Sequence, residues 1–168
     1  MKIRSFMTMM VAAAALVIGV SSCGDDDDEP EVALAAQVAG SYTGDETLTV
    51  NGEPDEGTAT FEFTKSSDIA VDMVIPEYGM GMMTLPPLEV KNITLTKTPT
   101  TVSENCITGT LSSYTGTVKN ADGSEKAYTV SDVTIFFELD AKRVVATFKL
   151  KYGNMPFAFE GQFVGKKK

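Results

Sequence analysis

From Gly40 onward the chain alternates apolar and polar side chains with a period of two, and this pattern constrains the fold more than any other feature. In the segment 58–65, Ala59, Phe61 and Phe63 lie on one side, with threonine and glutamate on the other. Seven further segments alternate in the same way: 42–50, 69–75, 88–97, 106–118, 132–139, 143–150 and 157–163. Such alternation is typical of antiparallel strands with one buried face. The sequence therefore predicts an all-β fold of eight strands.

The connections between these segments are short and contain turn-forming residues, such as Asn51-Gly52, which favours a meander of neighbouring strands. Eight such strands can hide their apolar faces in a closed barrel or in a sandwich. We favour the barrel, because closure also removes exposed strand edges. A change of apolar parity between Leu111 and Tyr114 predicts a β-bulge near Ser112 and Ser113.

One short helix is predicted before the first strand, over residues 30–39. It begins with Pro30 and Glu31, and Gly40 follows it as a stop. At about ten residues such a helix is marginal alone. We therefore expect it to pack against the strands that follow.

Composition excludes several classes of function. The 168 residues, which suit one domain, include no histidine, so catalysis by Ser-His-Asp or Cys-His groups and histidine-ligated metal centres are excluded. A formal net charge of −9 argues against nucleic acid as a partner. The acids of the predicted strands lie scattered on outer faces, without the paired carboxylates of glycoside hydrolysis. We expect no enzymatic activity, no cofactor and no metal.

The N-terminus is typical of a secretory signal. Lys2 and Arg4 precede an uncharged, largely apolar stretch that is too short for a stable membrane span. The sequence Val20-Ser21-Ser22-Cys23 that follows resembles the lipobox of bacterial lipoproteins. The resemblance implies a signal peptide over 1–22 and an acylated Cys23 that anchors the protein to the lipid bilayer. The alternative is an ordinary signal peptide whose cleavage site lies near a cysteine.

An acidic segment, Gly24-Asp25-Asp26-Asp27-Asp28-Glu29, comes directly after this cysteine. Dense like charges repel and stay extended, so we interpret 23–30 as a solvated tether. The segment also resembles the acidic export signal of surface lipoproteins in the Bacteroidota. That resemblance implies an outer-membrane protein exposed at the cell surface.

Two further sequences carry a family resemblance. Val38-Ala39-Gly40-Ser41-Tyr42-Thr43-Gly44 opens the first predicted strand, and Phe159-Glu160-Gly161-Gln162-Phe163-Val164-Gly165 ends the last. With the lipobox, they resemble the calycin-like β-barrel lipoproteins of Bacteroidota, which implies an eight-stranded up-and-down, lipocalin-like barrel within the domain 31–168. Tyr42 stands where lipocalins have tryptophan. The chain also has no arginine in its last strand, so the ligand binding of lipocalins is not carried over, and the family itself implies no particular activity.

The inner face of the predicted barrel supplies the candidate ligand-lining residues. These are Tyr42, Glu46, Phe61, Phe63, Met73, Phe137, Phe148 and Phe159. The aromatic residues either line an apolar pocket or fill the lumen completely. Glu46 either fixes a polar group of a ligand or lies at a wet rim.

A methionine-rich segment, 78–88, is the most distinctive part of the sequence. Tyr78, Met80, Met82 and Met83 form a candidate lid loop. Its alternatives are a plug over one end of the barrel, a partner-binding surface, and a copper(I) site. Cys106 is expected to be buried, and Lys166-Lys167-Lys168 to be a solvated tail.

These observations together predict a lipid-anchored, non-catalytic barrel that binds a small apolar or amphipathic ligand. The alternative is a filled barrel that serves as a structural or interaction subunit of an envelope protein complex.

Overall fold

The computed structural model describes residues 32–80, 83–101, 103–120 and 122–168. The predicted signal peptide, Cys23 and the acidic tether lie outside the described residues. In the described ranges one helix, α1 (Leu34–Val38), precedes ten strands. The strands are β1 (Gly40–Val50), β2 (Glu53–Ser67), β3 (Ala70–Ile75), β4 (Tyr78–Met80), β5 (Met83–Leu85), β6 (Leu88–Lys97), β7 (Cys106–Lys119), β8 (Glu125–Glu138), β9 (Arg143–Tyr152) and β10 (Phe159–Lys167). No helix in this part of the chain is long and apolar enough to cross a membrane.

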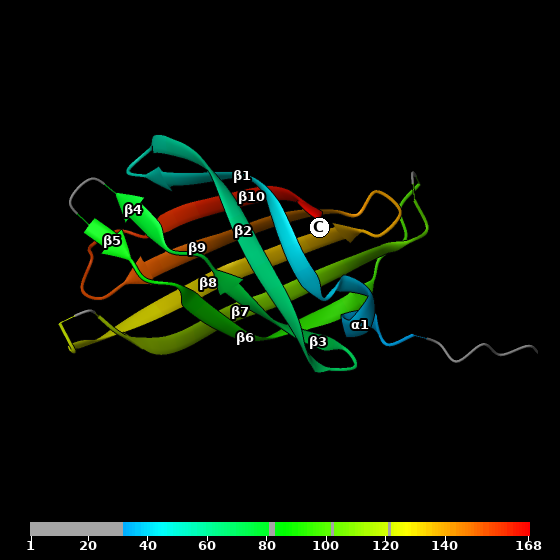
Figure 1. Ribbon diagram of the computed structural model, residues 1–168, viewed down its shortest axis with the longest axis horizontal. Helices are drawn as coiled ribbons and strands as arrows, with labels where there is room; N and C mark the ends of the chain where they lie inside the picture. Colours follow the sequence, from blue (N-terminus) through cyan, green and yellow to red (C-terminus); the bar gives the residue numbers. More distant parts are fainter. Residues whose placement is uncertain (1–31, 81–82, 102, 121) are drawn as a thin grey trace, which may run out of the picture. The chain divides into compact units, whose positions relative to one another are not determined.

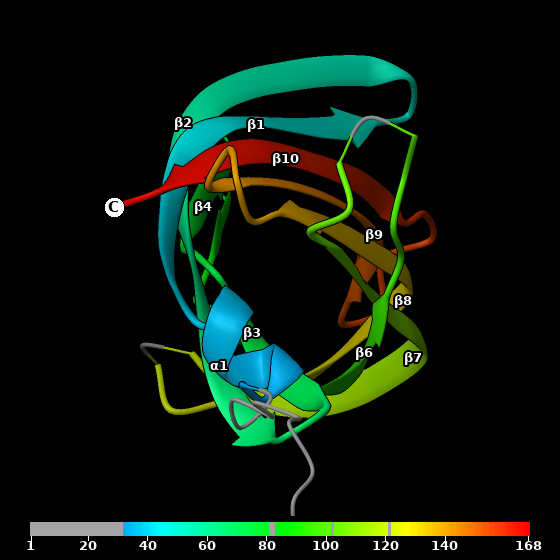
Figure 2. The ribbon, with the colours of Figure 1, turned by 90° about the vertical axis from the view of Figure 1, so that its right-hand side faces the viewer.

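Eight of the strands close into a barrel in the order β1-β10-β9-β8-β7-β6-β3-β2, and every neighbouring pair is antiparallel. The predicted barrel is thereby confirmed, and the sandwich is excluded. The first strand pairs with the last, from Tyr42 opposite Lys167 to Thr49 opposite Glu160. Figure 1 shows the barrel from the side, and Figure 2 looks along it from the end where α1 lies.

The connection between β1 and β2 illustrates how local sequence sets the strand pairing. Asn51 and Gly52 both adopt positive φ, 51° and 86°, and Val50 pairs with Glu53 across them. Two consecutive residues with positive φ are required by the hairpin turn that matches strand twist, and Asn-Gly is its preferred sequence. This turn lies at the end of the barrel opposite α1 (Figure 1).

The prediction of a bulge at Ser112 and Ser113 is wrong, because the pairing of β7 with β8 is regular there. Leu111 pairs with Val133 and Ser113 with Ser131, so β7 and β8 keep one register through this region. The register shift lies between β8 and β9 instead, where Asp132 adopts a φ of 52°. Because β7 and β8 bend together, the apolar parity changes in both strands at the same level.

Helix α1 is shorter than predicted, with five residues. It buries Ala35 and Val38 completely against the strands, which supplies the stability that so short a helix lacks alone. Ile69, predicted to face inward, is 58% exposed because it lies in the turn that precedes β3.

The end of β10 corrects the expectation of a solvated lysine tail. The Lys167 ammonium lies 5.8 Å from the centre of the Tyr42 ring and donates a hydrogen bond of 3.2 Å to the carbonyl of Gln37 in α1. The Tyr42 hydroxyl in turn donates to the carbonyl of Val38 at 2.9 Å. The last strand therefore does carry a cation against Tyr42, a lysine rather than an arginine, and it ties the first strand, the last strand and the helix together.

Candidate functional site

The barrel brings the predicted lining residues together inside its lumen. Seven of them are apolar and at most 3% exposed: Tyr42, Phe61, Phe63, Met73, Phe137, Phe148 and Phe159. They come from β1, β2, β3, β8, β9 and β10, so only closure of the sheet makes them neighbours. Whether they contact a ligand stays a prediction.

Aromatic rings pack against one another along the lumen, in the α1 half and also beside Glu46, since Phe163 pairs with Glu46 across β1 and β10. Tyr42, Phe63 and Phe137 contact one another, with ring centres 5.1 to 5.9 Å apart. Farther along the barrel, Phe61 stacks on Phe163 at 4.2 Å. Edge and stacked contacts at such distances are favourable in protein cores. The barrel is therefore packed by its own side chains from the α1 end to the level of Glu46.

Glycine makes room for one of these rings. A Cβ at Gly161 would lie 2.3 Å from the Phe148 ring, so the ring rests against the bare backbone of β10. A side chain at Gly161 would force the Phe148 ring out of its position. The Phe-Glu-Gly-Gln-Phe sequence therefore has a packing role.

Glu46 lies inside the barrel at the end opposite α1, and it is the feature of the lumen that packing alone does not explain. It is 4% exposed, and its neighbours across β10 and β2 are Phe163 and Gly57, neither of which has a polar side-chain atom. Its Oε1 atom is buried without a hydrogen-bond partner among the described residues. The wet-rim interpretation of Glu46 is therefore wrong: the carboxyl is buried.

Burial raises the pKa of the Glu46 carboxyl to about 7, because a charge is poorly solvated there. Near neutral pH the group is thus divided between its neutral and charged forms. The neutral form can donate one hydrogen bond, and the charged form can accept several. A ligand with a hydroxyl or amine group would supply the partner that Oε1 lacks.

The hairpin of β4 and β5 lies at this end of the barrel (Figure 1). Leu85 is 2% exposed within the core, and Tyr78 packs against the same core. Burial, and then the nearby carboxylates of Asp55 and Glu46, raise the pKa of Tyr78. The Tyr78 hydroxyl and the Glu46 carboxyl are therefore close enough to interact.

The sequence predicted Tyr78 in this region and missed two of its neighbours. Asp55 follows a turn, and Leu85 lies in a segment without strand periodicity, so neither carried a signal. Of the other predicted lid residues, Met82 and the side chains of Met80 and Met83 lie outside what the structure describes. Cys106 is buried and unpaired. Among the described residues no three histidine, cysteine or acidic side chains are grouped to hold a metal ion.

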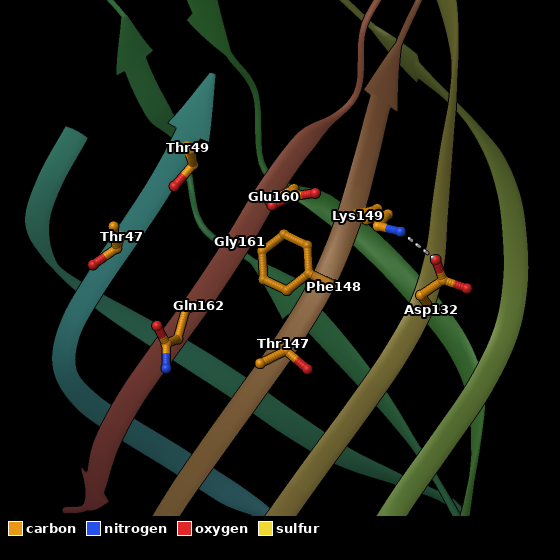
Figure 3. Close-up of a pocket in the computed structure, with 9 residues that line it drawn as sticks. All are labelled: Thr47, Thr49, Asp132, Thr147, Phe148, Lys149, Glu160, Gly161 and Gln162. Atoms are coloured by element: carbon orange, nitrogen blue, oxygen red, sulfur yellow. Dashed lines mark ion pairs between the residues drawn. The ribbon is translucent and has the colours of Figure 1, made fainter. Parts of the chain in front are cut away.

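A hollow of about 440 Å³ lies on the outer surface of the barrel (Figure 3). Thr47, Gln162 and Thr147 line it from β1, β10 and β9. Its charges neutralise one another, since the Lys149 ammonium lies 3.0 Å from the Asp132 carboxylate. Asp132 raises the pKa of Lys149, and Glu160 raises it by a smaller amount. We interpret this groove as ordinary polar barrel surface.

Comparison with known proteins agrees with the architecture. The sequence profile of the calycin-like beta-barrel domain matches residues 38–166. A crystal structure of a "putative outer membrane protein" from Bacteroides fragilis NCTC 9343 is similar, with a TM-score of 0.60 and 17% sequence identity. The match covers 81% of this chain and 53% of the other, so this chain spans about half the length of that protein. No curated protein matches the sequence.

Proposed function

Since the chain belongs to the family of calycin-like β-barrel domains, we propose that it binds a small amphipathic molecule in the end of the barrel that contains Glu46. The apolar part of this molecule contacts the inner side chains, and a hydroxyl or amine group meets the Glu46 carboxyl. Barrels of this family are typically binding folds rather than enzymes. The proposed role is accordingly non-catalytic.

One observation carries this proposal: the buried Oε1 atom of Glu46 has no partner among the described residues. A buried polar atom left without a hydrogen bond costs about 1–3 kcal/mol. A leucine of similar size in this position would avoid the cost. An acid that destabilises an apolar lumen is understandable when a ligand supplies the missing bond.

We further propose that residues 1–22 are a signal peptide and that acylated Cys23 anchors the domain, 31–168, to the outer membrane through the tether 23–30. The lipobox-like sequence and the acidic segment support this arrangement and the surface location. The description of the Bacteroides fragilis protein as a "putative outer membrane protein" agrees with an envelope location. Mass spectrometry of the N-terminal peptide from the native protein tests the anchor: acyl chains on Cys23 are expected, and an unmodified cysteine contradicts it.

Native mass spectrometry of the chain purified from its own host tests the ligand. The expected result is a reproducible extra mass that disappears on denaturation. In a Glu46→Leu variant this mass should be absent, because the polar partner is gone. Glu62→Leu, which changes an exposed glutamate of β2, is the matched control and should retain it. A bare chain mass for the native protein, with the fold intact, contradicts the proposal.

The packed rings near α1 support a second function, that of a filled structural or interaction subunit in an envelope complex. In that case the partner contacts the outer surface or the segment 78–88. Capture from membranes distinguishes this function: a stoichiometric protein should be retained by the native chain and lost on deletion of residues 80–83. Retention of ligand mass together with no stoichiometric protein would exclude it.

A further inference from the structure

A hollow of about 260 Å³ opens at the α1 end of the barrel, between the helix and the ends of β1, β8, β9 and β10. Tyr42 and Phe137 form its apolar floor, and Gln37 of α1 stands at one side. Lys142, Arg143 and Lys167 also line it, and we call these three the basic mouth. Figure 2 looks onto this end of the barrel.

Of the nearby acids, Glu138 also lines the hollow and offsets the charge of Arg143, which leaves the charges of Lys142 and Lys167. Glu138 is engaged by Arg143, with Oε2 and Nη1 3.2 Å apart. Asp140, in the adjoining turn, accepts hydrogen bonds from the side chains of Ser103 and Asn105. In the described part of the chain no carboxylate forms an ion pair with Lys142 or Lys167.

The two remaining cations, Lys142 and Lys167, line the same hollow. Burial, and then the charge of Lys142, lower the pKa of Lys167, which is only partly exposed. Lys167 is held in place by its bond to the Gln37 carbonyl and by the Tyr42 ring. Exposed Lys166 and Lys168 add further positive charge on either side. An anion between Lys142 and Lys167 would relieve this repulsion.

The volume and the lining residues of the hollow limit the kind of anion that it can bind. At about 260 Å³ it is below the usual range for drug-sized ligands, and it suits a single polar group with a small apolar neighbour. Lysine ammonium groups bind phosphate as point charges, whereas the planar fork of arginine binds a carboxylate or a phosphate at two points. Here the one arginine already holds Glu138.

We propose that the basic mouth is a binding site for a phosphate group, held between Lys142 and Lys167 over the rings of Tyr42 and Phe137. The site is separate from that of Glu46, because the four steps along extended β1 from Tyr42 to Glu46 span about 13 Å. It therefore does not depend on the proposed function. The phosphate belongs either to a lipid headgroup or to a free phosphate ion.

The test is NMR titration of the full chain in micelles of an uncharged detergent at constant ionic strength. In one arm inorganic phosphate is added. In the other, dihexanoyl phosphatidylglycerol is compared with dihexanoylglycerol, which has the same acyl chains and no phosphate. Saturable shifts are expected for the backbone amides of Tyr42, Phe137, Lys142 and Lys167.

Lys142→Asn is the informative variant. Lys142 has a φ of 50°, a conformation that asparagine tolerates, and its side chain supports no described contact of the fold. The variant should bind about threefold to fivefold more weakly, as expected for one partly exposed ion pair. Lys151→Gln, on the exposed face of β9, is the control and should bind as the native chain does.

The two arms separate the sources of the phosphate. Saturable amide shifts that occur with inorganic phosphate, are confined to the basic mouth and weaken in Lys142→Asn would support the site and identify its ligand as a free phosphate ion. The same shifts with phosphatidylglycerol alone support the site and assign it to a lipid headgroup. Shifts spread evenly over all lysines, shifts unchanged in Lys142→Asn, or no saturable shifts in either arm would overturn the proposal.

Discussion

The two ends of the barrel treat buried polar groups in opposite ways. At the α1 end the Tyr42 hydroxyl and the Lys167 ammonium each donate to a backbone carbonyl of the helix. At the other end Glu46 is nearly as buried as Tyr42, yet its Oε1 has no described partner. At the first end these bonds tie the strands to the helix. The second keeps a polar atom at a cost in stability, which is typical of a functional site.

The packed half of the lumen should show the largest effect of substitution. Phe63→Ala removes the ring that joins Tyr42 and Phe137, and the free energy of unfolding is expected to fall by about 3–5 kcal/mol. Urea denaturation measures the change. Phe157→Ala, which removes a half-buried ring, should cost clearly less. Equal losses in the two variants would mean that the α1 half is not tightly packed.

The pH dependence of stability should isolate Glu46. Its pKa is about 7 in the folded chain and near 4.5 when unfolded, so the folded state binds more protons between these values. Stability is therefore full below about pH 4.5 and falls as pH rises toward 7. At about 1.4 kcal/mol per pKa unit, the loss approaches about 3 kcal/mol.

Thermal unfolding of the native chain and Glu46→Gln from pH 4.5 to 8 measures this effect, because other titrating groups cancel in the difference. The native chain should lose stability relative to the variant as the pH rises. Parallel curves would show that the carboxyl is solvated.

Glu46→Leu should raise the free energy of unfolding by about 1–2 kcal/mol at pH 4.5, where the native carboxyl is neutral. A substitution that stabilises the fold while abolishing ligand binding would establish that Glu46 is kept for function. Glu62→Leu, on the outer face of β2, should change stability by less than about 0.5 kcal/mol. Destabilisation by Glu46→Leu would indicate a structural role for the carboxyl.

The smallest effects concern the satisfied hydroxyl groups. Tyr42→Phe removes the bond to Val38, and Tyr128→Phe removes a 2.6 Å bond to the carbonyl of Glu89 near the Glu46 end. Each variant should lose about 1 kcal/mol. Similar losses would show that hydrogen-bonded hydroxyl groups stabilise both ends alike, so that the two ends differ only at Glu46. A Tyr128→Phe variant more stable than the native chain would contradict this conclusion.

Periodicity predicted the barrel well wherever one strand face is buried. It missed the start of β2, where Glu53–Gly57 are all exposed, because backbone pairing without a buried face leaves no alternation. It also missed β4 and β5, which are three residues each. The change of apolar parity between Val130 and Val133 is visible in β8 alone, but the assignment of the register shift to the pairing of β8 with β9 is not.

For the candidate site, the sequence predicted which way Glu46 faces but not how completely it is buried. Parity placed Glu46 inward, but its burial at 4% exposure depends on closure of the barrel, which pairs it with Phe163 of the last strand. Three consecutive lysines are typical of a solvated end, yet pairing of β10 with β1 brings Lys167 onto Tyr42. Both features arise from contacts between distant segments, which local sequence does not encode.

The pairing of β1 with β10 also has a consequence for the time at which the fold can form. The first strand finds one of its two neighbours only when residues 159–167 are available, so the contacts that close the barrel have nearly the largest sequence separation the domain allows. Loop closure of this kind slows folding. A chain emerging from a ribosome would thus keep an open barrel until residues 159–167 have been synthesised.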